Sequence, residues 1–233
     1  MEPTFILFAV LGVAVFAAIA YYAHLQEKKR REALAAFADE MGWRFSPEPD
    51  RTLPDRYPEH RVFRRGHSRV GRNAIRGALA VESEGGDRLE LPIEMGDYKY
   101  TTGSGKNKRT HNLSYLLIQA PPGTRNSLAI RTENFADKMA AAMGFDDIDF
   151  ESVEFSDRFH VKSDDKRFAY DVLHPRMMEF LMNSMAPDIE LQTGALCLHS
   201  SGTRWDPPEF KLRLRWVQQF FALWPRHVVG ARR

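Results

Sequence analysis

The feature that most constrains this chain is an uncharged, apolar run near its start, TFILFAVLGVAVFAAIAYYA, over residues 4–23. As a helix, a run of this length crosses roughly 30 Å, the hydrocarbon core of a bilayer, because each residue adds about 1.5 Å. A helix also satisfies its own backbone polar groups, which a segment inside lipid must do. We therefore predict an N-terminal transmembrane helix, with the lipid bilayer as partner, whose membrane-spanning residues include Thr4, Phe5, Leu11, Phe16 and Ala23.

Two other interpretations of the run compete with a membrane anchor. A secretory signal peptide normally begins with basic residues, and none precedes this run, although Ala18 and Ala20 supply an A-x-A cleavage pattern. The signal-peptide alternative therefore stays open. A buried core helix fits less well, because the run is apolar on every face and longer than the roughly 10 to 14 residues of such segments.

The charges that flank the run predict its orientation. Only Glu2 is charged before it, whereas four consecutive basic residues follow it: Lys28, Lys29, Arg30 and Arg31. Because cytoplasmic flanks carry an excess of Lys and Arg, we expect a single-pass protein of the cell membrane with its C-terminal part in the cytoplasm. We divide the chain into an anchor, residues 1–26, and one cytoplasmic domain, residues 27–233, with a sub-boundary near residues 121–127.

Composition limits the function classes only weakly. The chain has 33 Lys plus Arg against 31 Asp plus Glu, so its net charge of +2 gives no argument for binding nucleic acid. Cys197 is the one cysteine, which rules out an internal disulfide framework. Its neighbours Leu196 and Leu198 favour a small buried side chain over a nucleophile.

The pattern after the anchor predicts an α+β fold, with a mixed, mainly antiparallel sheet and flanking helices. We expect strands at residues 43–45, two within 60–81, 88–94, a hairpin within 97–119, and further strands at 128–130, 147–151 and 155–162, then a hairpin at 189–198. Helices are expected at 32–41, 134–143, after the Asp164-Asp165 cap, from Pro175 onward, and at 208–224. The four prolines within residues 46–59 predict a surface loop.

Three stretches carry a partial resemblance to known proteins. FSDRFHVKSDDK (residues 155–166) and YDVLHPRMMEFL (170–181) resemble a domain of unknown function in uncharacterised bacterial membrane-anchored proteins. DYKYTTG (97–103) is similar to related hypothetical proteins. The resemblance implies a membrane-tethered α+β domain and brings no catalytic residue with it.

No linear motif in the sequence gives strong evidence for a catalytic, phosphate-binding or metal site. Gly103-Ser104-Gly105-Lys106 looks like a phosphate loop, but Tyr100 and Asn107 occupy positions where that loop needs glycine and Ser or Thr. The acidic residues between 146 and 157 alternate along a strand pattern, which favours a solvated face over a cation site. The eight histidines lack zinc-ligand spacing. We therefore predict no catalytic residue, cofactor or metal.

Basic residues without acidic neighbours form the remaining signal. Residues 60–81 and 98–132 contain no Asp or Glu. We predict that one basic face binds anionic lipid headgroups or a protein partner, through Lys28, Lys29, Arg30, Arg31, Arg64, Arg65, Lys106, Lys108 and Arg109. The alternative is that these side chains pair with the acidic residues 146–157 or stay solvated.

These observations favour a binding or adaptor module at the membrane. The alternative is a membrane-tethered enzyme whose site is not visible as a linear motif. A deep apolar cleft with converging polar groups would favour the enzyme, and a flat basic or apolar patch would favour the module.

Overall fold

A computed structural model describes residues 3–82, 86, 88–121, 124–132, 148–200 and 202–225. The helix predicted over 134–143 and the acidic residues Asp146 and Asp147 lie outside these ranges. The helices are α1 (Pro3–Met41), α2 (Leu53–Arg56), α3 (Arg61–Arg64), η1 (Gly105–Asn107), α4 (Val153–Arg158), α5 (Lys166–Val172), α6 (Pro175–Asn183) and α7 (Pro207–Ala222). The strands are β1 (Arg44–Ser46), β2 (His67–Glu82), β3 (Arg88–Thr102), β4 (Arg109–Gln119), β5 (Leu128–Thr132), β6 (Phe159–Ser163), β7 (Ile189–Gln192) and β8 (Ala195–His199).

The strands form one eight-stranded sheet in the order β1-β2-β3-β4-β8-β7-β5-β6. Every ladder between the described strands is antiparallel. The predicted α+β class, an apolar N-terminal helix followed by a sheet with flanking helices, is therefore confirmed. Strands from both sides of residues 121–127 belong to this sheet.

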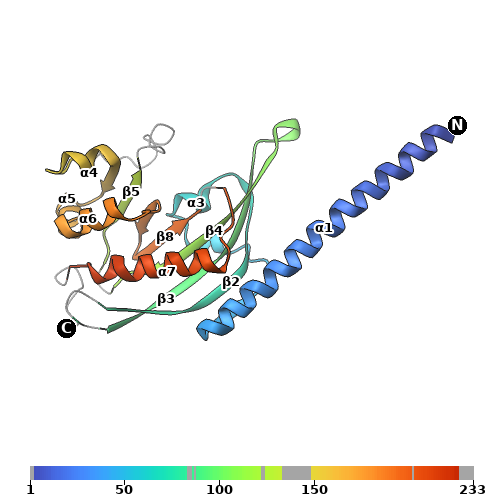
Figure 1. The fold of residues 1–233 in the computed structure, drawn as a ribbon. Helices are drawn as coiled ribbons and strands as arrows, with labels where there is room; N and C mark the ends of the chain where they lie inside the picture. Colours follow the sequence, from blue (N-terminus) through green and yellow to red (C-terminus); the bar gives the residue numbers. More distant parts are fainter. Residues whose placement is uncertain are drawn as a thin grey trace.

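The sheet has an apolar core on each face. Along β4, Leu116 and Ile118 enter the larger core, whereas Tyr115 and Leu117 enter the smaller one, because successive side chains of a strand point to opposite faces. The larger core is covered by the C-terminal third of α1 together with α5, α6 and α7, and the smaller one by α2 and α3. Figure 1 shows α7 lying along the sheet and α1 crossing its edge.

Helix α1 is unbroken for 39 residues but has two different environments. From Val10 to His24 its side chains are exposed, and Figure 1 shows this half extending away from the sheet. Further along, Leu34, Phe37 and Ala38 are buried in the larger core at the predicted helical spacing. The phenyl ring of Phe37 stacks on that of Phe210 in α7, with centroids 6.3 Å apart.

Two predicted segments between residues 46 and 82 are wrong. Residues 46–59 contain the short helix α2, which has Pro54 in its first turn, where its missing N–H does no harm. They also contain a bridge between Asp50 and Gly71. The stretch 60–81 forms α3 and one long strand, β2, in place of two strands with a turn. β-Bulges between His67 and Val70 and between Arg72 and Ile75 interrupt its pairing with β3, but the strand continues through them.

Two more predictions fail near the acidic run. No strand forms over the described residues 148–152, and the predicted strand at 155–162 begins as helix α4. Ser152 caps α4 by accepting a hydrogen bond from the backbone N–H of Phe155 at 3.3 Å. Over the described residues 148–151, the alternating pattern belongs to a loop that buries Ile148 and Phe150, and not to a strand.

The later elements agree with their sequence signals. The carboxylate of Asp165 caps α5 by accepting hydrogen bonds from two backbone N–H groups, α6 begins at Pro175, and β7 and β8 form the predicted hairpin. The ambiguous last segment is the helix α7, as predicted. It starts with a capping box in which Asp206 and Glu209 each accept from the other's backbone N–H at 2.9 and 2.8 Å.

Candidate functional site

The exposed half of α1 is the first element of the candidate site. Among the described residues, α1 is the helix that is long and apolar enough to cross a membrane. No part of its most apolar stretch is buried in the protein. Leu11 is 57% exposed and Phe16 74% exposed, whereas a water-facing helix normally carries polar side chains there. Thr4 and Phe5 lie at the start of the same helix, and Ala23 is exposed near the end of the apolar run. By length and composition this segment therefore suits a lipid environment.

The second element is a β-bulge where α1 meets the sheet. In β2, Asn73 and Ala74 lie opposite the single residue Gly96 of β3. Asn73 adopts a positive φ of 52°, which asparagine tolerates better than most residues. A side chain at Gly96 would come within 2.8 Å of the Asn73 carbonyl oxygen, so glycine is required there. The bulge directs the Asn73 amide toward α1.

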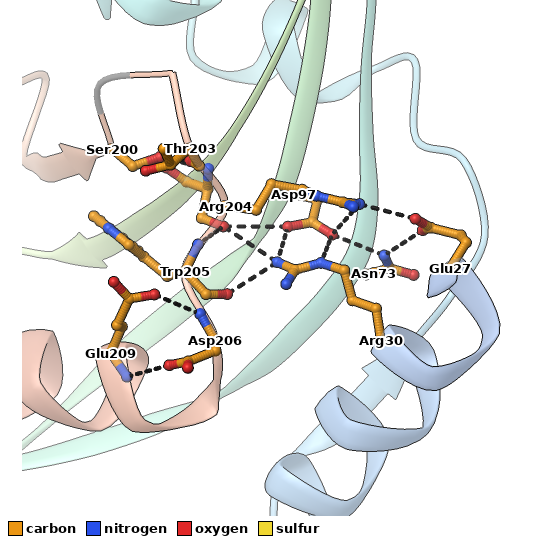
Figure 2. A network of polar contacts seen from close by, with 11 residues as sticks. Glu27, Arg30, Asn73, Asp97, Ser200, Thr203, Arg204, Trp205, Asp206 and Glu209 are labelled. Carbon is orange, nitrogen blue, oxygen red and sulfur yellow. Dashed lines mark hydrogen bonds and ion pairs between the residues drawn. The ribbon is translucent and has the colours of Figure 1, made fainter. Parts of the chain in front are cut away.

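Next to the bulge, the carboxylate of Asp97 accepts hydrogen bonds from three residues. Arg30 of α1 donates through Nε to Oδ2 at 2.7 Å and through Nη2 to Oδ1, a bidentate pair (Figure 2). Asn73 donates to Oδ2 at 2.8 Å and Ser114 to Oδ1 at 3.2 Å. The side chains of Arg30 and Asp97 are 13% and 8% exposed, so this is an ion pair nearly withdrawn from water.

The third element is the loop between β8 and α7. Arg30 also donates to the backbone carbonyl of Trp205 at 3.0 Å, and the Trp205 N–H donates to Ser114 Oγ at 2.9 Å. The indole of Trp205 is buried against Phe210 in α7. One guanidinium on α1 therefore holds two strands and the start of α7 together.

An outer pair extends this network toward the apolar half of α1. Arg204 donates to Glu27 at 2.8 Å and lies 3.8 Å from Asp97 (Figure 2). Burial raises the pKa of Glu27, but the hydrogen bonds from Arg204 and Asn73 outweigh it, and the pKa lies below its usual value. We call the residues Glu27, Arg30, Asn73, Asp97, Ser114, Arg204 and Trp205 the helix clamp.

The opposite face of the sheet carries a separate polar cluster. Arg56 of α2 and Arg76 of β2 both donate to the carboxylate of Glu94, at 2.9 and 3.1 Å, and Tyr115 donates to it at 3.1 Å. Arg56 also donates to Asp50, and although burial raises the pKa of Asp50, its hydrogen bonds lower it to about 2. This cluster fastens α2 to the sheet and contacts no part of the helix clamp.

A small polar cavity of about 20 Å³ lies beside Glu190 of β7. Glu190 accepts from the backbone N–H of Arg61 at 3.0 Å, and Arg131 Nη2 lies 4.0 Å from its other carboxylate oxygen. Burial raises the pKa of Glu190 to about 7. The cavity has room for about one water molecule, so it is not a substrate site.

The basic residues predicted to form one face lie in three places. Lys28, Lys29 and Arg31 are exposed on α1, whereas Arg30 is largely buried in the helix clamp. Arg64 ends α3 and Arg65 caps it, and both lie near the charge of Glu190 on the other face of the sheet. Lys106, Lys108 and Arg109 are exposed at the tip of the β3–β4 hairpin. The Gly103-Ser104-Gly105-Lys106 motif forms this tip, in a strand-to-strand turn.

Sequence reasoning missed most of the helix clamp. No motif links Arg30 to Asp97 or to Trp205, because these two residues are 67 and 175 positions away from it. One signal was present. Gly96 lies inside a strand, and a glycine there often marks a bulge or a close approach of another backbone.

No protein-family model and no curated protein matches the sequence. Among solved structures, the chain is similar to the crystal structure of the mycobacterial trehalose monomycolate transport factor A, TtfA. The match has a TM-score of 0.56 and 12% sequence identity, and covers 84% of this chain and 96% of that chain. The two chains share a fold. At this identity the likeness concerns the architecture alone.

Proposed function

We propose that this protein is a membrane-anchored binding or adaptor module whose domain is held in a fixed orientation at the bilayer. The observation that carries the proposal is the continuity of α1. One helix contains both an exposed apolar segment of membrane length and a buried segment that the helix clamp fixes to the sheet. An anchor joined by a flexible linker would need no such clamp.

The proposed placement follows the charges. Because Lys28, Lys29 and Arg31 follow the apolar segment, the domain of residues 27–233 would lie in the cytoplasm, with residues 1–26 as a retained anchor. The resemblance of residues 155–166 and 170–181 to uncharacterised membrane-anchored proteins agrees with a membrane anchor. Cleavage of a signal peptide after Ala20 is the competing outcome. Intact-mass measurement of the protein purified from membranes distinguishes the two.

The fold shared with a transport factor is compatible with an adaptor role. We propose that the domain binds a protein partner that acts at or across the same membrane. In agreement with this, the described domain exposes large apolar side chains, of which Met185 is 82% exposed and Leu212 56% exposed. The two lie on neighbouring segments, since Arg213 donates to the carbonyl of Met185 at 3.2 Å.

Site-specific photocrosslinking tests the adaptor proposal. A photoreactive residue at Leu212 or Met185 of the full-length protein in native membranes should capture the same partner at high yield. The matched control is the exposed position Glu154 on α4, which should not capture it. Equal, unspecific products from all three positions would contradict the proposal.

The alternative, a membrane-tethered enzyme, is favoured by one groove of about 290 Å³. Its lining includes Asp188, His199, Glu209 and Arg213. Burial lowers the pKa of His199, so its imidazole is harder to protonate than a solvated one. A small molecule that raises the melting temperature of the wild type but not of His199→Gln would support this function.

A further inference from the structure

The tip of the β3–β4 hairpin carries a concentrated group of exposed positive charge, separate from the basic residues of α1. Lys106, Lys108 and Arg109 are all exposed within four positions, and residues 98–132 contain no acidic residue. The tip therefore presents three positive charges, and the nearest carboxylate in its own strands is Asp97, in the middle of β3. Such a group attracts an anionic surface within about one Debye length, roughly 8 to 10 Å at physiological salt.

The backbone that carries these three residues is held in a defined turn. Gly103 has a φ of +69°, and a side chain there would collide with the carbonyl of Asn107. His67 contacts the Gly103 carbonyl through Nε2 at 3.1 Å, and Thr102 Oγ1 lies 2.8 Å from His111 Nε2. The turn at the tip is therefore held by contacts with β2, through His67, and with β4, through His111.

The helix clamp fixes the hairpin relative to the anchor. Figure 1 shows the hairpin rising out of the sheet toward the same end of the molecule as the N-terminal half of α1. Arg30 and Asp97 join α1 to β3, and β3 is the strand that leads into the hairpin. A bilayer that receives residues 4–23 would therefore face the tip.

We propose that the tip of the β3–β4 hairpin binds the anionic headgroups of the membrane that α1 enters. This inference rests on the proposed function, because it needs α1 in the bilayer. The hairpin would form a second contact with the membrane beside the anchor. Two contacts would fix the orientation of the domain relative to the membrane surface. Each Lys or Arg near an anionic leaflet strengthens such a contact.

Fluorescence quenching in nanodiscs tests the proposal with the full-length protein. Ser104→Cys places a thiol at the tip, and the native Cys197 is buried with its pKa raised by burial, so a thiol-reactive bimane marks the tip. The nanodiscs contain phosphatidylcholine alone or with phosphatidylglycerol, and carry a quencher on the headgroup. Glu154→Cys is the matched control position, and Phe16→Cys with an acyl-chain quencher reports whether α1 is inserted.

The proposal predicts headgroup quenching of the bimane on the Ser104→Cys variant in anionic nanodiscs. This quenching should be lost at 1 M salt, where the Debye length is about 3 Å, and when Lys106→Ser, Lys108→Ser and Arg109→Ser are added to that variant.

Three results would overturn the inference. One is no quenching of the tip label while the label on the Phe16→Cys variant is quenched, which would leave the proposed function standing. Another is equal quenching of the tip label in neutral and anionic nanodiscs, unchanged when the three basic residues are replaced. The third is no quenching of the label on the Phe16→Cys variant, which would refute the anchor and the inference together.

Discussion

Arg30 on α1 forms a bidentate ion pair with Asp97 on β3, 67 residues further along the chain. The Asp97 side chain is 8% exposed. The pair therefore joins α1 to the sheet at a place that is largely shielded from water. A buried pair with many partners contributes chiefly to geometry, because desolvation offsets much of its Coulomb energy. Removing one partner is costly, since the other charge stays buried.

We therefore expect Asp97→Asn to destabilise the protein by about 3 to 5 kcal/mol, because Arg30 would keep its charge without a carboxylate. Thermal unfolding of the protein in detergent measures the loss. The double variant Arg30→Met with Asp97→Asn should recover part of it, since no buried charge remains unpaired.

An exposed ion pair between the same helix and α7 provides the control. Lys211 donates to Glu40 at 2.6 Å, but the two side chains are 38% and 60% exposed. Glu40→Gln should cost less than about 1 kcal/mol, because water screens such pairs. A loss as large as that of Asp97→Asn would show that burial is not what distinguishes the helix clamp.

Gly96 should be intolerant of a side chain. Alanine there would meet two backbone carbonyl oxygens, of Asn73 at 2.8 Å and Arg72 at 2.9 Å, and backbone cannot rotate away. We expect Gly96→Ala to cost roughly 1 to 3 kcal/mol by equilibrium unfolding. Gly71→Ala in β2 is the control: its nearest neighbour, also at 2.8 Å, is the end of the Leu53 side chain, which can move. Equal losses for the two variants would contradict this reasoning.

How far the sequence predicted this structure depends on the range of the interactions involved. Local signals were sufficient for α6, α7 and the cap at Asp165, because each needs only neighbouring residues. Local signals misplaced the start of β6. The alternating pattern from Phe155 onward predicted a strand, but residues 153–158 form the helix α4, which buries Phe155. The helix clamp could not be predicted, because Arg30 resembles its exposed neighbours Lys29 and Arg31 until the sheet places Asp97 beside it.

Glu190 should make stability depend on pH. Its pKa is raised from 4.5 to about 7 in the folded protein, so the folded state binds a proton that the unfolded chain has lost. The stability from this protonation is fully present below pH 4.5 and is lost as the pH rises through about 7.

Glu190→Gln should remove this dependence, because glutamine stays neutral and its oxygen can still accept from the Arg61 N–H. Relative to the wild type, the variant should gain stability between about pH 5 and 8, by up to about 3 kcal/mol. Denaturant unfolding at several pH values measures it. Parallel pH profiles for the two proteins would be incompatible with the raised pKa.

Cys197 should be inert in the folded protein. It is fully buried, and burial raises the pKa of its thiol, so little thiolate forms. We expect a thiol reagent to modify the native protein far more slowly than the denatured one, by mass spectrometry over time. Rapid modification of the native protein would mean that the smaller core opens easily.

The helix clamp should hold the domain rigidly on its anchor. Double electron–electron resonance between spin labels at His24→Cys on α1 and Arg215→Cys on α7 measures this rigidity, in nanodiscs that hold the full-length protein. We expect one narrow distance distribution, which broadens in the Asp97→Asn variant. A broad distribution in the wild type, or no change on removing Asp97, would contradict it.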